Sequence, residues 1–378
     1  NSFHAPTYRQ TIVGSINQSN IRCIMKITFI TPHIKIAGGI RAILTYASRL
    51  AQRGHDVDVL VPEPRTFIRW FRNIFMRTPG WFPNFAARIR WIPSYESRYI
   101  PVGDAIIATA WQTASMVAGA RPESGRKFYF IQAYESFFKT QTDRAEATYR
   151  LPLRHIVISS WLKGLLREKF GTSAEILVTP VDTKLFHFVP TVRMSEPIRV
   201  LVLDHHAQLK GLAAAHAAVQ VARAAGARFK VVMFGTRKTE AAVWADEYIL
   251  NPPQNKLAEL YSACHIYLCP SWFEGLGMPP MEAMACKNML VTYDTGGCRD
   301  YAFNDKTALV TQMRNHVAVA AAQAVPENER SALAQALVRA VNDIALRERI
   351  SATGYEFITT HFSWERAIEQ MENILHHD

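Results

Sequence analysis

Short apolar runs alternate with helical stretches along most of the chain. Ile27–Thr31 and Val57–Val61 are mostly apolar, which predicts two buried strands. Between them, Ile40–Arg53 places apolar residues three and four positions apart, which is the spacing of one helix face. Strand, helix and strand in this order form a βαβ unit, which predicts a parallel sheet covered by helices on both faces.

The same alternation continues towards the C-terminus. Further strands are expected at Ile89–Ile92, Ala105–Ala108, Lys127–Ile131, Ile156–Ser159, Ile176–Thr179, Val200–Asp204, Lys230–Phe234, Ile266–Pro270 and Met289–Tyr293. Helices are expected at Trp161–Phe170, Lys210–Ala225, Lys256–Cys264 and Met278–Lys287, and throughout most of the chain after Asn315. Residues 187–197 interrupt the pattern with two prolines. We therefore expect two doubly wound α/β domains, with a ligand site in the cleft between them, at the carboxyl ends of the strands.

Composition and charge narrow the possible classes. The chain has 378 residues, 49% of them hydrophobic and 20% charged, which excludes a disordered, collagen-like or coiled-coil protein. No apolar stretch is long enough to predict a transmembrane helix. Five cysteines, never spaced as CxxC, predict buried thiols in a reducing compartment, without a disulfide framework or zinc site. The net charge of +11 predicts an anionic partner: nucleic acid, a phosphorylated small molecule or a membrane surface.

Residues 1–24 show no clear period before Met25 opens the first strand. We interpret them as an added or poorly ordered lead-in that lies outside the fold. No sustained apolar core precedes a small-residue cleavage site, so no secretory signal is expected and the chain is expected to be cytoplasmic.

The densest chemistry lies in the segment Cys269–Asp300. A predicted strand ends there, and a loop then carries Glu274 and the glycine-rich run Gly275–Met278. Glycines let a backbone approach a ligand closely. Pro279–Pro280 suit the first turn of a helix, whose free N–H groups and positive dipole end form an anion site. Glu282 follows one turn into this helix.

Carboxylates suit sugar hydroxyls, and amides suit phosphate oxygens, so this arrangement predicts a ligand in which a sugar is joined to a phosphate. The alternative is that Glu274 is a solvated loop residue and Glu282 a surface helix residue. The Gly-x-Gly sequence and the strand–loop–helix context disfavour that alternative.

The segment PSWFEGLGMPPMEAMAC resembles the paired-glutamate signature of retaining glycosyltransferase family 4, whose members have the GT-B fold of two Rossmann-like domains. This block is the specific part of the resemblance, which extends from Met25 to the end of the chain. Weaker matches are Gly38–Gly39, Ser159–Trp161, Thr179–Phe186, Leu209–Gly211, Thr295–Gly297, Asp300 and Phe362–Trp364. The resemblance implies an acceptor-binding domain over 25–190 with a returning helix at about 361–378, a nucleotide-sugar domain over 191–360, and an active site in the cleft.

The resemblance also implies an activity. The chain would transfer a glycosyl group from a nucleotide-diphosphate sugar with retention at the anomeric carbon, with neither a metal nor another cofactor. Lys210 would neutralise the diphosphate leaving group, and Glu274 would hold the donor sugar. Glu282 would bind the nucleotide ribose. The implied donor-binding residues are Gly38, Gly39, His205, Arg237, Gly275, Leu276, Gly277, Met278 and Glu282.

Two departures from the family pattern leave alternatives open. Many members place an arginine five or six residues before the lysine, where this chain has His205 and Asp204. His205, His206 and Arg237 are the candidate replacements, and none is preferred.

The second departure concerns the acceptor side. The segment Gln132–Glu135 resembles bacterial rhamnosyltransferases of surface-glycan synthesis, so Gln132 and Glu135 would face the acceptor. The alternative is a polar loop that caps Tyr134. Rhamnose is the first choice of donor sugar, and mannosyl, glucosyl and galactosyl donors stay open.

The segment Arg65–Trp91 has its own signature, with six arginines, eight aromatic residues, no lysine and no acidic residue. Phe67, Trp70, Phe71 and Ile74 lie at helical spacing. This composition predicts an interfacial helix on an anionic membrane, at the inner face of the cell membrane. One alternative is a helix that packs its aromatic stripe on the first domain. Another is single-stranded nucleic acid, which is disfavoured because the sugar–phosphate site explains the charge more simply.

These observations favour a glycosyltransferase that acts on a growing cell-surface glycan or a lipid-linked acceptor. A catalytically inactive nucleotide-sugar-binding protein is the alternative, and the presence of Lys210, Glu274 and Glu282 disfavours it. No GxGxxG follows a strand with an acidic residue at the required distance, and GxxxxGK[ST] is missing, so a dehydrogenase and a P-loop kinase are not expected.

Overall fold

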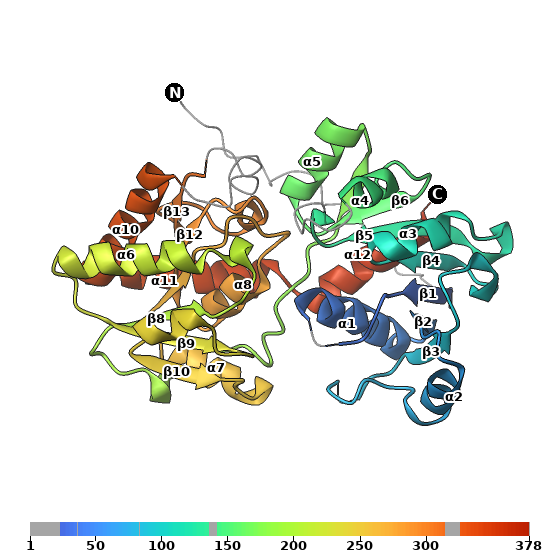
Figure 1. Cartoon of the computed structure of the whole chain (residues 1–378), viewed down its shortest axis with the longest axis horizontal. Coiled ribbons are helices and arrows are strands. Elements are labelled where there is room, and N and C mark those ends of the chain that lie inside the picture. The colour runs from blue at the N-terminus through green and yellow to red at the C-terminus, as the bar shows by residue number, and fades with distance from the viewer. Residues whose placement is uncertain (1–22, 36, 83, 136–141, 314–325, 378) are drawn as a thin grey trace.

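Two parallel α/β halves lie side by side in the computed structural model of this chain (Figure 1). The structure describes residues 23–377 except 36, 83, 136–141 and 314–325. Most of the expected lead-in, residues 1–24, therefore lies outside the described residues. The expectation of two doubly wound Rossmann-like domains is confirmed.

The N-terminal half is built on a seven-stranded sheet of order β3-β2-β1-β4-β5-β6-β7. Its strands are β1 (Lys26–Ile30), β2 (Asp56–Pro62), β3 (Arg88–Ile92), β4 (Ala105–Ala108), β5 (Arg126–Ile131), β6 (Arg154–Val157) and β7 (Ala174–Ile176). The helices of this half are α1 (Gly38–Gln52), α2 (Thr66–Phe75), α3 (Trp111–Ala118), α4 (Thr142–Thr148) and α5 (Ser160–Phe170). All pairings are parallel, and the chain changes direction across the sheet between β1 and β4.

The C-terminal half repeats the plan with a six-stranded sheet of order β10-β9-β8-β11-β12-β13. Its strands are β8 (Arg199–Leu203), β9 (Lys230–Gly235), β10 (Glu247–Leu250), β11 (Ile266–Cys269), β12 (Met289–Tyr293) and β13 (Ala308–Thr311). Its helices are α6 (Leu212–Ala224), α7 (Leu257–Ser262), α8 (Met278–Ala285), α10 (Glu327–Asn342) and α11 (Ile344–His361). Here the change of direction lies between β8 and β11. Ligands of such sheets bind at these switch points, beyond the carboxyl ends of the strands.

The sequence pattern fails mainly at the edges of the sheets. The edge strands β10 and β13 are not predicted, because β10 has no buried residue and β13 is buried over only its first half. The helix expected at Lys210–Ala225 starts later, at Leu212, since Gly211 takes a left-handed φ of 69° and ends a short 3-10 turn. β7 covers Ala174–Ile176 and not Ile176–Thr179, because its partner β6 ends at Val157.

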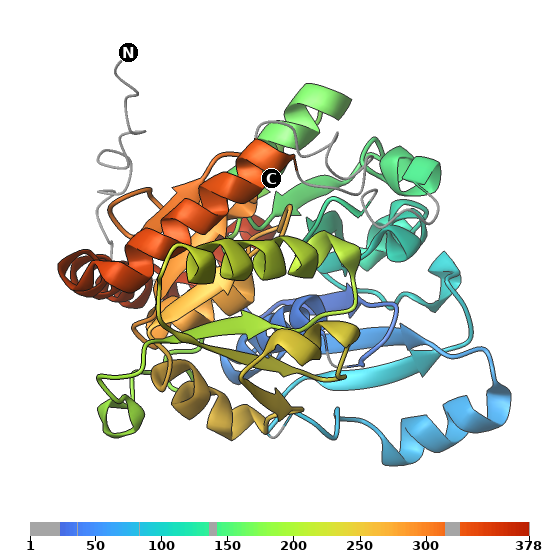
Figure 2. The same ribbon diagram turned by 60° about the vertical axis from the view of Figure 1, so that its left-hand side comes forward.

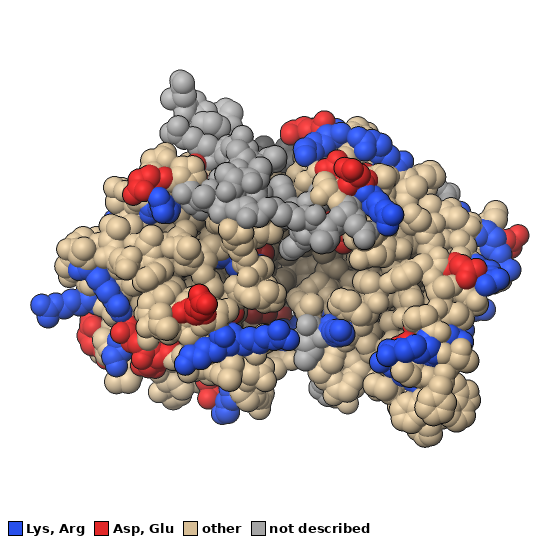
Figure 3. Space-filling model, viewed as in Figure 1, with Lys and Arg blue, Asp and Glu red and all other residues tan. Residues whose placement is uncertain are grey.

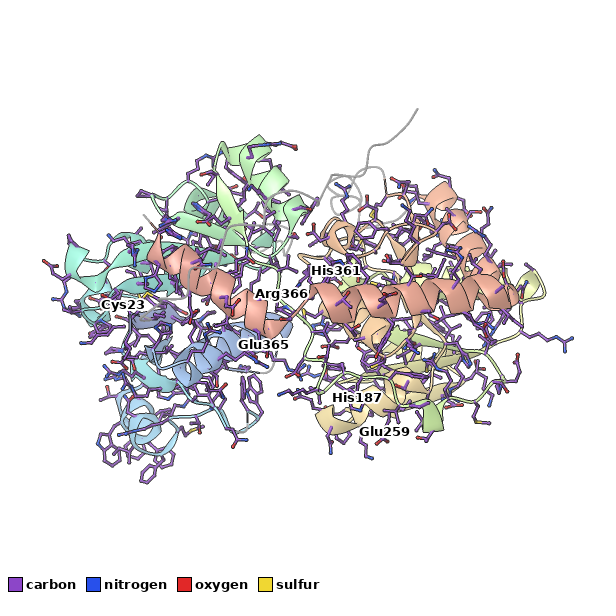
Figure 4. The ribbon with its side chains drawn as sticks, turned by 180° about the vertical axis from the view of Figure 1, so that it is seen from behind. Cys23, His187, Glu259, His361, Glu365 and Arg366 are labelled. Atoms are coloured by element: carbon purple, nitrogen blue, oxygen red, sulfur yellow. The ribbon has the colours of Figure 1, made fainter. Side chains whose placement is uncertain are left out.

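The chain ends on the N-terminal half. In Figure 4, which views the molecule from behind, α11 lies in front of the C-terminal half and α12 (Trp364–His376) in front of the N-terminal half, with Glu365 and Arg366 near the crossing. Glu372 of α12 accepts hydrogen bonds from Arg53 Nε at 2.8 Å and Arg53 Nη2 at 2.9 Å. His55 Nδ1 accepts the Met25 N–H, so its Nε2 carries the proton that faces Glu372 Oε1 at 3.1 Å. These bonds fasten α12 to the start of β1 and the end of α1.

We predict that Glu372→Gln lowers the free energy of unfolding by about 2–3 kcal/mol, because the neutral amide cannot accept two charge-assisted bonds from a nearly buried arginine. Urea unfolding followed by circular dichroism measures the change. Glu369→Gln is the matched control. The Glu369 side chain is 57% exposed, and its Oε1 lies 3.9 Å from Arg53 Nη1. This substitution should therefore lower the free energy of unfolding by less than about 0.5 kcal/mol. Equal losses in the two variants would contradict the role of Glu372.

Candidate active site

Lys210 and Glu274 meet at the switch point of the C-terminal sheet. Lys210 follows β8 and Glu274 follows β11, the two strands that flank the change of direction. Gly211 lets the two loops touch, because a Cβ at this position would lie 2.0 Å from the carbonyl oxygen of Pro270. The Trp272 N–H donates to the Leu209 carbonyl at 2.9 Å and closes the junction.

The two side chains form a direct ion pair. Lys210 Nζ donates to Glu274 Oε1 at 2.6 Å, and the side chains keep 27% and 14% of their surface exposed. Burial by itself lowers the pKa of the Lys210 ammonium, but the adjacent Glu274 carboxylate outweighs burial and raises it above its usual value. Lys210 is therefore a fixed positive charge that still reaches solvent.

The backbone of Glu274 is held by the glycine turn that follows β12. Its N–H donates to the Thr295 carbonyl at 2.9 Å, and its carbonyl accepts the Gly297 N–H at 3.1 Å. The sequence resemblance pairs these two segments only by order along the chain, whereas the structure brings them into contact. This clamp fixes the direction of the Glu274 side chain.

Free amides lie directly after this pair. α8 begins at Met278, and Pro279–Pro280 supply no N–H in its first turn. The N–H groups of Gly275, Leu276, Gly277 and Met278 make no hydrogen bond to other residues that the structure describes. Together with the positive end of the helix, they form a place for an anion beside Lys210.

Glu282, one turn further along α8, faces the N-terminal half. Tyr261 OH donates to its Oε2 at 3.1 Å, and Arg41 Nη1 of α1 lies 3.7 Å from its Oε1. Burial raises the pKa of this carboxyl, while Arg41 and Tyr261 oppose the rise. Arg41 is a site residue that the sequence analysis misses. Its position two residues after Gly39, on the predicted helix, was the available signal.

The structure places the candidate replacements for the missing arginine in different surroundings. The His205 ring lies near Lys210 and Glu274, stacks on His206 with ring centres 4.7 Å apart, and accepts the Ala207 N–H at Nδ1. Its pKa is lowered, mainly by burial and then by Lys210. Arg237 lies on the loop after β9, and its exposed guanidinium makes no hydrogen bond or ion pair with other residues in the described ranges. Asp204, in contrast, ties this loop to β8 through Thr239 and Tyr248.

Gln132 and Glu135, which are expected on the acceptor side, line a cavity of about 470 Å³ in the N-terminal half, at the switch point between β1 and β4. Gly39, at the start of α1, lies against Gln132, which lines this cavity together with Glu135. Gly38, beside it, is exposed. Trp111, Gln112 and His33 also line the cavity, and the sequence analysis misses all three. The signal for Trp111 was an aromatic residue shortly after the predicted strand Ala105–Ala108.

The two halves of the site are in contact. The Gln132 carbonyl oxygen lies 2.0 Å from where a Cβ on Gly275 would be, so only glycine fits there. A second contact joins Asp300 to α5, where its Oδ2 accepts the Ser160 N–H at 2.8 Å. Figure 3 shows the surface hollowed near the line where the two halves meet.

Glu135 has a structural role as well as a place in the cavity. Its Oε2 accepts the Trp111 N–H at 2.9 Å, at the start of α3, and the Tyr129 hydroxyl at 3.0 Å. Burial raises the pKa of this carboxyl to about 7, although both hydrogen bonds oppose the rise. The Glu135 side chain therefore caps the start of α3. The alternative of a polar loop that caps Tyr134 does not describe this side chain.

Residues 192–357 match the family model of "Glycosyl transferases group 1". The chain is 26% identical over 351 residues to the O-antigen biosynthesis protein RfbC of Myxococcus xanthus. The aligned region covers 89% of this chain. The matched region is only 26% of the length of RfbC.

Solved structures share the fold of the two halves. Sucrose-phosphate synthase of Thermosynechococcus elongatus superposes with a TM-score of 0.70 at 17% identity, over 92% of this chain and 98% of its own. HepE of Anabaena, solved with UDP and glucose, also gives 0.70, at 13% identity, over 93% and 99%. The C-terminal half of this chain therefore resembles the group 1 glycosyltransferases over residues 192–357, and the two halves together have the GT-B fold of these solved structures.

Proposed function

We propose that this chain transfers a sugar from a nucleotide-diphosphate sugar to a glycan acceptor, and that the acceptor binds in the cavity of the N-terminal half. The observation that carries the proposal is the Lys210–Glu274 ion pair beside the free amides of Gly275–Met278. A cation and several amide donors at one point suit a diphosphate, and a fixed carboxylate suits the hydroxyls of the attached sugar.

The chemistry assigns different tasks to these groups. When the bond between the anomeric carbon and the phosphate oxygen breaks, negative charge builds on the diphosphate. Lys210 and the amides at the start of α8 stabilise that charge, which is work that a metal ion does in other enzymes. We therefore propose a metal-independent reaction. The Glu282 carboxylate binds the ribose, and the nearby Arg41 neutralises it while the site is empty.

Retention at the anomeric carbon is proposed from the paired glutamates, which resemble those of retaining enzymes. Rhamnose is the first choice of donor sugar because of the Gln132–Glu135 segment, and hexoses are the second. HepE was solved with UDP and glucose, which supports a nucleotide-diphosphate donor in this fold. The similarity to RfbC, an O-antigen biosynthesis protein, supports a surface glycan, free or lipid-linked, as acceptor. The proposed location is the cytoplasmic face of the cell membrane.

An inactive binding protein is the second candidate. Such a protein would use the same ribose and phosphate contacts, Lys210 included, without breaking the bond to the anomeric carbon. The cavity next to the anion site, which offers room for an acceptor, favours the enzyme.

The proposal predicts that one nucleotide sugar raises the melting temperature and is turned over in the presence of EDTA. A thermal-shift screen of dTDP-rhamnose and the UDP-, GDP- and ADP-hexoses identifies the donor, because a ligand stabilises the folded state that binds it. NMR of the product then reports the anomeric configuration. Stabilisation without turnover on any acceptor would favour the inactive binding protein. Turnover that EDTA abolishes and Mg²⁺ restores would contradict metal independence.

Lys210→Ala should lower kcat by about 10²–10³, which corresponds to roughly 2.7–4 kcal/mol of lost charge stabilisation. Donor binding should change less, because the amides and Glu282 remain. Steady-state kinetics and a donor titration separate the two effects. Lys210→Arg keeps the charge and is the matched comparison, so it should recover part of kcat. Near-normal turnover in Lys210→Ala would show that another group stabilises the leaving diphosphate.

The raised pKa of Glu135 predicts that the stability of the fold depends on pH. Its pKa is about 7 in the folded protein and ordinary when unfolded, so the stabilising effect of its bound proton is present below about pH 4.5 and is lost as the pH rises through 7. The free energy of unfolding of the wild type should therefore fall by on the order of 2 kcal/mol relative to Glu135→Gln between pH 5 and pH 8. Urea unfolding at each pH measures it. Glu123→Gln, an exposed carboxylate in the same half, should follow the wild type. Parallel curves for Glu135→Gln and the wild type would contradict the assignment.

A further inference from the structure

α2 presents an apolar surface that nothing in the described structure covers. None of its ten residues is buried. We call its exposed side chains, together with the next residue, the α2 apolar face: Phe67, Trp70, Phe71, Ile74, Phe75 and Met76. Phe67 is 75% exposed and Phe75 66%. Single exposed apolar residues are common on proteins, but a contiguous group that includes four aromatic rings marks a contact surface.

The opposite side of α2 is what attaches it to the body. The Asn73 side chain donates to the Trp91 carbonyl and accepts the Trp91 N–H, both at 2.9 Å. Arg72 stacks on the Trp91 ring, with its guanidinium 4.3 Å from the ring centre, and bonds Glu63 at 2.7 Å. The polar side is therefore the packed one. The alternative in which the aromatic stripe packs on this half of the molecule is wrong.

The arginines contribute less free charge than the sequence suggests. Arg65 and Arg72 both bond Glu63, whose pKa is lowered to about 2, mainly by the hydrogen bond from Arg65, so Glu63 is an anion at neutral pH. Arg88 and Arg90 are paired with Asp58. Arg69 and Arg77, in contrast, donate only to backbone carbonyl oxygens among the described residues. Neither of these two arginines is paired with a carboxylate among the described residues.

The position of α2 leaves the rest of the molecule accessible. In Figures 1 and 2 the helix lies at the outer edge of the N-terminal half, on the side away from the C-terminal half. In Figure 3 the bulge at this place is mostly tan, with a blue patch beside it. A surface that covered α2 would therefore not cover the contact between the two halves.

We propose that the α2 apolar face inserts into the interfacial layer of a membrane with anionic headgroups, and that Arg69 and Arg77 lie among the headgroups. Aromatic rings at the acyl boundary with cations beside them, and no acidic residue within the helix, match this surface. No described helix is both long and apolar enough to cross a bilayer, so the contact would be peripheral. The acceptor cavity lies in the same half, so docking would hold it near lipid-linked glycans. This last consequence rests on the proposed function, whereas the docking itself does not.

The test is co-sedimentation of the full chain with vesicles of phosphatidylcholine, with or without phosphatidylglycerol. The wild type should bind the anionic vesicles, and Phe67→Ala/Trp70→Ala/Phe75→Ala should lower the partition coefficient at least tenfold. The matched control replaces exposed apolar residues of the other half, Val243→Ala/Leu250→Ala, and should bind as the wild type does. Circular dichroism and donor titration verify that each variant is folded, so this result does not depend on turnover.

The charge contribution has its own variant. Arg69→Gln/Arg77→Gln should weaken binding three- to tenfold at 0.1 M salt. The difference should disappear at 1 M salt, where the Debye length falls from about 10 Å to about 3 Å. Arg98→Gln is the control, because this arginine is 68% exposed in the same half but is paired with Glu96. Trp70→Phe should reduce the blue shift of tryptophan emission that vesicles cause.

Three outcomes would overturn the proposal. The wild type could bind neither kind of vesicle, or the triple alanine variant could bind as tightly as the wild type. The third is a concentration-dependent dimer in sedimentation velocity that the triple variant abolishes, without any vesicle binding. That result would identify a second copy of the chain as the occupant of the α2 apolar face.

Discussion

The ion pair between Lys210 and Glu274 joins two loops that leave neighbouring strands in opposite directions, and the geometry of the site depends on it. Burial disfavours the charged form of Lys210, but the Glu274 carboxylate at 2.6 Å more than offsets this effect and raises the pKa of the lysine. Lys210 therefore stays charged within reach of solvent. The backbone clamp from Thr295 and Gly297 then fixes where this charge pair points.

The second constraint is the close approach of the two halves. Gly275 touches the backbone of Gln132, Arg41 faces Glu282, and Asp300 caps the helix that begins at Ser160. Each contact joins a segment at the carboxyl end of one sheet to a counterpart in the other half. The anion site and the cavity lined by Gln132 are consequently neighbours, and α12 fastens the chain behind them through Glu372.

α2 packs its polar side against the rest of the protein and exposes its apolar side. Most amphipathic helices bury their apolar side, but this one uses Asn73 and Arg72 to attach to Trp91 and leaves its aromatic side uncovered. The arrangement needs Glu63, because a buried carboxylate that binds two arginines keeps like charges from repelling one another at the base of the helix. The cavity lined by Gln132 and Glu135 and the exposed helix thus belong to one half of the molecule, and the anion site belongs to the other.

The sequence by itself determined the two parallel α/β halves, most strand positions, and the segments that carry Lys210, Glu274 and Glu282. Apolar periodicity records burial within one element, and short motifs record local turns. An edge strand such as β10 cannot be predicted from apolar periodicity, because none of its residues is buried. Only the tertiary structure decided that Arg41 faces Glu282, that Trp111 lines the cavity with Glu135, and that Glu63 pairs with two of six arginines. These are contacts between residues far apart in the chain or across a helix face, and no local pattern encodes which side chains meet in space.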